Sequence, residues 1–158
     1  MASQKSVSAN VSAENLLLVQ YRYWMTGHAT RKVCYWDRAW DILSRALNPE
    51  QAKSLFTDLH VFTRLVRDQA ARELAWHPQP CRCPCHDESL MLALIRASQH
   101  GEEFIETLAA SELLGTHRVD ELVRASRSTA RCLQSCGLTL GNAQSAAVET
   151  PSPRQTLH

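Results

Sequence analysis

The chain has 158 residues, of which 44% are hydrophobic, so a single folded domain with its own core is expected. Its 17 basic and 16 acidic residues give a formal net charge of +1, which removes the simplest argument for a nucleic-acid-binding or membrane-surface protein. No apolar run approaches the roughly 18 residues that a membrane span requires, and no signal-peptide pattern opens the chain. We therefore expect a cytoplasmic protein with reduced thiols.

Hydrophobic periodicity predicts helices along most of the chain, after a flexible N-terminus over residues 1–11. A first helix is expected from a cap at Ser12 to a stop at Gly27. A second, over residues 30–47, has apolar residues at spacings of three and four, which is typical of a face that fills a core. Cys34 on this helix is also expected in the core. The apolar face consists of Val33, Trp36, Trp40, Leu43 and Leu47.

The segment Asn48-Pro49-Glu50-Gln51 is typical of a helix start. It supplies a cap residue, a proline at the first helical position and a glutamine that can reach back to the cap. A third helix is therefore predicted from here to about Trp76. Three arginines lie off its apolar face, and Asp68 stands four positions before one of them, which favours a solvated, salt-bridged face over a phosphate-binding one. These arginines are Arg64, Arg67 and Arg72.

Prolines in residues 77–86 exclude a continuing helix, because each lacks an N–H donor and restricts the residue before it. Asp87 is expected to cap a fourth helix that runs to about Gln99, before a break at His100-Gly101. The prolines are Pro78, Pro80 and Pro84.

Two further helices are predicted. The fifth ends at Gly115, and the sixth runs from a cap at Thr116 to a stop at Gly137. Residues 139–158 contain little that could be buried and are predicted to form a disordered tail. The apolar residues of the fifth helix are Phe104, Ile105, Leu108, Leu113 and Leu114.

The predicted fold class is therefore all-α. We expect a bundle of five or six helices within a single domain over residues 12–138. Its two halves, residues 12–76 and 87–137, would be joined by a Cys-rich loop over residues 77–86.

Charge is unevenly distributed between these halves. Residues 20–76 contain nine bases and six acids, whereas residues 87–121 contain two bases and eight acids. The halves are expected to attract each other, although an acidic outer face could instead meet a basic partner.

The Cys-rich loop, His-Pro-Gln-Pro-Cys-Arg-Cys-Pro-Cys-His, contains three of the six cysteines and two of the seven histidines. Alternate residues of an extended chain point the same way, so its three thiols would share one side. Zinc prefers four thiolate or imidazole ligands, and either histidine could complete the set. The sequence thus predicts a zinc site, although a proline-containing strand must bend to bring alternating cysteines to one ion. Its ligands would be Cys81, Cys83, Cys85 and either His86 or His77.

Three other interpretations of this loop remain open. Cys83-Pro84 matches the short signature of haem-regulatory sites. Arg82 and His86 could favour a thiolate, which would suit a redox switch. The thiols could also be inert. Cys132 and Cys136, four apart on the last helix, would share a face and could either join the loop ligands or fill the core.

Three stretches of the chain together resemble small helical proteins of rhizobia and related α-proteobacteria. The resemblance covers roughly residues 15–135 and implies a bacterial, cytoplasmic setting. It transfers no activity and no site. The stretches are Tyr21-Arg22-Tyr23-Trp24-Met25, Trp36-Asp37-Arg38-Ala39-Trp40, and Cys81 with Cys85 ahead of Asp87-Glu88.

No phosphate loop, nucleophile elbow or His-Glu-x-x-His motif is found, so an enzyme is not expected. We expect a non-enzymatic regulatory or protein-interaction module with a zinc-binding loop and a protein partner. A thiol-based redox regulator is one alternative. A nucleic-acid-binding regulator is another, and its basic residues would be Arg22, Arg31, Lys32, Arg38 and Arg45.

Overall fold

The computed structural model describes residues 2–79 and 83–141, with side chains described from Ala13 onward. The described residues form helices and contain no strand, so the all-α prediction is confirmed. None of these helices combines the length and apolar character needed to cross a membrane. The helices are α1 (Ala2–Thr30), α2 (Val33–Ala46), α3 (Pro49–Gln69), α4 (His86–His100), α5 (Glu103–Leu114) and α6 (Asp120–Ser135).

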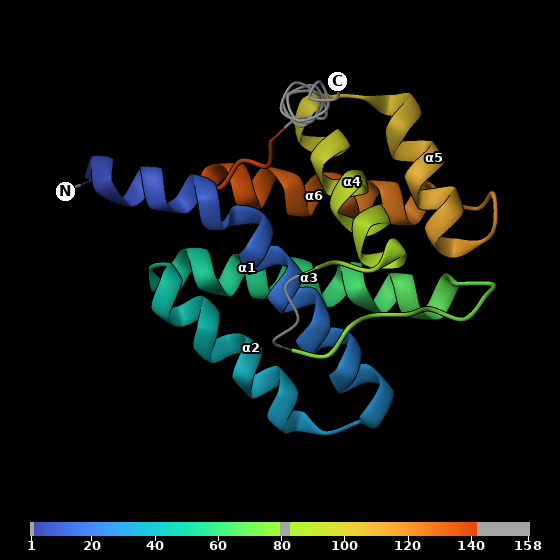
Figure 1. Cartoon of the computed structure of the whole chain (residues 1–158), viewed down its shortest axis with the longest axis horizontal. Coiled ribbons are helices and arrows are strands. Elements are labelled where there is room, and N and C mark those ends of the chain that lie inside the picture. The colour runs from blue at the N-terminus through green and yellow to red at the C-terminus, as the bar shows by residue number, and fades with distance from the viewer. Residues whose placement is uncertain (1, 80–82, 142–158) are drawn as a thin grey trace, which may run out of the picture.

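Helices α3 and α6 run side by side through the middle of the molecule (Figure 1). Helices α1 and α2 pack on one side of α3, and α4 and α5 lie on the other side of the molecule, with α4 packed against α6. Buried apolar residues from all six helices form one continuous core. The two predicted halves therefore share a core. Its largest fully buried apolar side chains include Leu17, Tyr21, Leu43, Phe62, Met91, Ile95 and Leu113.

Helix α1 continues through Gly27, so the predicted stop at this residue is wrong, and the helix begins at Ala2 instead of Ser12. The glycine has a different role. A Cβ atom at this position would lie 2.3 Å from Nε1 of Trp36, so only glycine lets α2 approach this closely. The helix ends at Thr30, and Arg31 follows in the left-handed conformation with φ of 61°.

The start of α3 is confirmed, because the Asn48 side chain accepts a hydrogen bond from the backbone N–H of Gln51 at 2.9 Å. The predicted end at Trp76 is wrong, since α3 ends at Gln69. The following chain turns back across α1 (Figure 1). Tertiary hydrogen bonds replace helical ones there: Ala71 N–H donates to the Leu114 carbonyl at 2.7 Å, and Trp76 Nε1 donates to Thr26 Oγ1 at 3.0 Å.

Two predicted caps are also wrong. Cys85, not Asp87, is the cap residue of α4, and Val119, not Thr116, precedes α6. Asp87 accepts hydrogen bonds from Arg72 and Ala75 instead, and the Thr116 hydroxyl accepts one from Arg118 N–H, before α6 begins. The predicted glycine ends are confirmed at Gly101 and Gly115, whose φ angles are 70° and 71°.

Burial differs from the sequence pattern in three regions. Val33 is 60% exposed and Trp40 is 36% exposed, so the tryptophan face of α2 is only partly in the core. On α5, three of the five apolar residues are exposed, and Glu106 is buried instead. Leu140, expected in the tail, is 1% exposed, and its N–H donates to Gln99 Oε1 at 2.7 Å. The remainder of the predicted tail, residues 142–158, lies outside the described residues.

Candidate functional site

Glu88, in the first turn of α4, organises the Cys-rich loop. Its side chain is fully buried and accepts four hydrogen bonds. Oε2 accepts from Arg22 Nε and from His77 N–H, both at 2.8 Å, and Oε1 accepts from Arg22 Nη2 at 3.0 Å and from Cys85 N–H at 2.9 Å. One carboxylate thus fixes both ends of the loop to α1.

Arg22 is the buried partner of this carboxylate, with a side chain only 2% exposed. Its guanidinium also donates to Gln79 Oε1 at 2.9 Å and to the Cys83 carbonyl at 3.3 Å. A buried cation with this many acceptors is not available to a phosphate backbone. Its assignment to a nucleic-acid-binding face is therefore wrong, whereas the other four basic residues of that set are exposed.

A second ion pair supports the same loop. Asp87 accepts hydrogen bonds from Arg72 and from Ala75 N–H, the latter at 2.8 Å. Burial alone would raise the pKa of Asp87, but the bonds from Arg72 and Ala75 outweigh it and leave the pKa below its usual value. The pKa of Glu88 is likewise lowered, because the bonds from Arg22 and the loop N–H groups exceed the effect of burial. Both acids are therefore ionised at neutral pH.

The fold brings together two of the five predicted zinc ligands. The ligand atoms of His77, Cys85 and Glu88 all lie within 4.8 Å of one another. Cys83 and His86 are exposed and are not members of this group. Cys81 lies outside the described residues. Glu88 was not predicted as a site residue, although its position three residues after Cys85 is that of a capping-box acid.

The remaining cysteines do not extend this site. Burial, then the neighbouring Cys136 and Asp58, raise the pKa of Cys132 to about 12, so its thiol is neutral at physiological pH. Burial also raises the pKa of Cys136. A protonated thiol is a poor metal ligand and a poor nucleophile, which favours the interpretation of this pair as packing residues. Cys34, predicted in the core, is exposed on α2.

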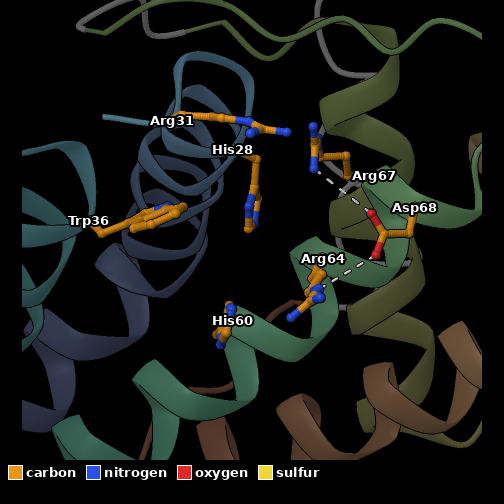
Figure 2. A pocket seen from close by; sticks show the side chains of 7 residues that line it. All are labelled: His28, Arg31, Trp36, His60, Arg64, Arg67 and Asp68. Atoms are coloured by element: carbon orange, nitrogen blue, oxygen red, sulfur yellow. Dashed lines mark ion pairs between the residues drawn. The ribbon is translucent and has the colours of Figure 1, made fainter. Parts of the chain in front are cut away.

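A pocket of about 340 Å³ lies at the C-terminal end of α1, between α1, α2 and α3 (Figure 2). We call it the arginine pocket. The pocket was not predicted from the sequence, because its residues come from three segments of the chain that only the fold brings together. The only signal was the spacing of four and three between residues 60, 64 and 67, which places them on one face of α3. Its lining consists of His28, Arg31, Trp36, His60, Arg64, Arg67 and Asp68.

Two of the three arginines predicted on the exposed face of α3 form salt bridges there, with Asp68 as their partner. Asp68 lies 3.5 Å from Arg64 Nε and 3.9 Å from Arg67 Nη1, and all three side chains are largely exposed. Arg72 instead pairs with Asp87 of α4.

No family model, curated protein or solved structure matches this chain. We therefore describe the class of this protein by its fold and its site alone. It is an all-α bundle of six described helices, with a Cys-rich loop joined to α1 by a buried ion pair.

Proposed function

We propose that this protein is a non-enzymatic regulatory or protein-interaction module of the bacterial cytoplasm, and that its Cys-rich loop binds zinc. One observation supports this proposal above others. The imidazole of His77 and the thiol of Cys85, eight positions apart, have ligand atoms within 4.8 Å of each other. Nitrogen and sulfur are the ligand types that zinc prefers in structural sites.

The two residues would provide half of a tetrahedral set. Cys81, Cys83 and His86 are the other donors that the loop offers. A bound ion would join the chain after α3 to the start of α4, so zinc binding would add to the stability of the bundle. A change in metal supply would then alter the loop that a protein partner meets.

We assign Glu88 to the support of the ligands and not to the ion. Coordination would remove its carboxylate from Arg22 and leave a buried guanidinium without its counter-ion. Breaking a buried pair in this way costs about 3–5 kcal/mol. Its bonds to the backbone of His77 and Cys85 instead orient the two residues that would contact the metal.

Elemental analysis of untagged protein, followed by zinc titration of the metal-free chain, tests this proposal. We expect about one zinc per chain, as for a single tetrahedral site. Cys85→Ser and His77→Asn should each weaken zinc binding at least tenfold, whereas Cys34→Ser, an exposed cysteine outside the loop, should not. Metal-free wild-type protein that also fails to bind added zinc would contradict the proposal.

The redox alternative uses the same loop, and the exposure of Cys83 two positions from Cys85 favours it. Hydrogen peroxide would oxidise one thiolate to a sulfenic acid with release of hydroxide. The second thiol would displace water from it to form a disulfide. Reversible loss of two thiols in metal-free wild type, but not in Cys83→Ser, would support this alternative. An unchanged thiol count after peroxide would exclude it.

A further inference from the structure

The arginine pocket gathers three guanidinium groups around one opening. Arg31 comes from the connection between α1 and α2, and Arg64 and Arg67 come from successive turns of α3. Figure 2 shows Arg31 and Arg67 pointing toward one another. Like charges facing each other are unfavourable unless an anion lies between them. Arginine is also the residue best suited to grip a phosphate or carboxylate through several N–H donors.

Arg31 has two unusual properties. It is the only non-glycine residue with a positive φ among the described residues, and a side chain in this conformation costs about 1 kcal/mol or more. No carboxylate of the described residues forms an ion pair with it. The left-handed conformation ends α1, where Arg31 N–H donates to the Gly27 carbonyl at 2.7 Å, and it leaves the Arg31 side chain in the lining of the pocket.

The charge of the pocket matches a dianion. Its three arginines and the single acid Asp68 leave two positive charges. The acid is 50% exposed and its ion-pair distances are 3.5 and 3.9 Å, so it competes only weakly for the guanidinium groups. A phosphate monoester carries about −1.5 to −2 charges at pH 7.

The remaining wall of the pocket is aromatic. His28 lies between Trp36 and His60, with ring-centroid distances of 5.5 and 6.2 Å. The His28 Nε2 atom is 3.1 Å from Thr63 Oγ1. Since that hydroxyl donates to the Leu59 carbonyl, Nε2 carries the proton and Nδ1 is the free acceptor. Flat rings beside cationic groups suit an organic group attached to the anion, and a volume of about 340 Å³ restricts it to a small one.

We propose that the arginine pocket binds a small phosphate monoester. Arg31, Arg64 and Arg67 would contact its phosphate, and its organic part would lie against Trp36 and His60. The electrostatics of the pocket agree with this. Burial, then the neighbouring His60 and Arg67, lower the pKa of His28 to about 4, so His28 is neutral at pH 7 and the positive charge of the pocket comes from its arginines.

Calorimetric titration of the full chain at low salt, with phenyl phosphate as the probe, tests the proposal. We expect phenyl phosphate to bind roughly tenfold more tightly than benzoate, which carries a single charge, and than inorganic phosphate, which lacks the ring. Equal affinity for benzoate would overturn the dianion assignment. Equal affinity for inorganic phosphate would overturn the assignment of the organic part, and no binding of phenyl phosphate at millimolar concentration would overturn the site.

Matched variants locate the site. Arg31→Gly removes the guanidinium at a position where glycine suits the backbone, so it should weaken phenyl phosphate binding about tenfold without lowering the melting temperature. Asp68→Asn should tighten binding several-fold, because it removes the competing acid. Arg45→Gln, an exposed arginine of α2 outside the pocket, should leave affinity unchanged. Equal weakening by Arg45→Gln and Arg31→Gly would overturn the proposal.

The proposed phosphate site uses no residue of the Cys-rich loop. Protein treated with a zinc chelator should therefore bind phenyl phosphate with unchanged affinity. Loss of binding after chelation would overturn the independence of the two sites.

Discussion

Arg22 of α1 and Glu88 of α4 form a buried bidentate ion pair, with Nε–Oε2 and Nη2–Oε1 distances of 2.8 and 3.0 Å. They are 66 positions apart in the sequence, and the side chains are 2% and 0% exposed. The pair crosses from the base-rich half of the chain to the acid-rich half. A second ion pair between the halves, Arg72 with Asp87, is only partly buried.

Removal of one member of the buried pair should destabilise the fold strongly. Arg22→Gln leaves the Glu88 carboxylate buried without its cation, so we expect the free energy of unfolding to fall by about 3–5 kcal/mol. Urea denaturation measures the loss. Arg64→Gln, which breaks an exposed pair with Asp68, should cost less than about 1 kcal/mol. Similar small losses in both variants would show that the buried pair does not join the halves.

The low pKa of His28 predicts a loss of stability in mild acid. Its folded-state pKa of about 4 lies below the ordinary value of 6.5, because of burial and the cations around it. Between these values the unfolded chain binds a proton that the folded chain excludes. Stability should therefore fall as the pH drops from 6.5 towards 4, by roughly 3 kcal/mol at most at 1.36 kcal/mol per pKa unit. The charged and titratable groups that face His28 are His60, Arg64, Arg67 and Asp68.

Urea midpoints of wild type and His28→Gln between pH 7 and 5 test this prediction. The variant keeps an N–H donor for Thr63 but cannot titrate, so its stability should change less over this range. The buried acids Asp87, Glu88 and Glu106 contribute little to the change in stability between pH 7 and 5. Their pKa values are lowered from 3.8 or 4.5, so the stability they add is lost only at lower pH. Parallel curves for the two proteins would contradict the assignment.

The features that the sequence predicts correctly act through a few neighbouring residues. Asn48 caps α3 because the N–H that its side chain accepts from, that of Gln51, is only three residues away, and Gly101 and Gly115 end helices because glycine tolerates their positive φ angles. These signals, together with apolar periodicity, are sufficient for the number and order of the main helices.

The errors arise where a distant residue decides the outcome. Glycine is the residue type that usually ends a helix, but at position 27 it lies inside α1 and leaves room for the Trp36 indole. Aspartate is a residue type that often caps helices, but Asp87 accepts hydrogen bonds from the Arg72 side chain and from Ala75 N–H instead. The candidate sites follow the same pattern. The loop cysteines are visible in the sequence, whereas the approach of His28 to His60 depends on the packing of α1 on α3.

Close packing at Gly27 predicts an unusual response to alanine. Alanine is the better helix former by about 1 kcal/mol, yet the new Cβ would overlap the Trp36 indole. We expect Gly27→Ala to destabilise the fold by about 1–3 kcal/mol, the usual cost of overpacking. In a Trp36→Leu background the same substitution should be neutral or stabilising. A stabilising effect of Gly27→Ala in wild type would show that the indole moves aside at little cost.

Burial of Leu140 predicts that the folded domain extends beyond the sequence-based boundary at residue 138. The side chain is 1% exposed, and its backbone bonds with Gln99 and His100 fix it against the end of α4. Leu140→Ala should lower the free energy of unfolding by about 2–5 kcal/mol, through lost burial and the cavity left behind. Leu108→Ala, which truncates a side chain 48% exposed, should change it by less than about 0.5 kcal/mol. Equal, small effects in the two variants would mean that the folded domain ends before Leu140, as the sequence pattern alone suggests.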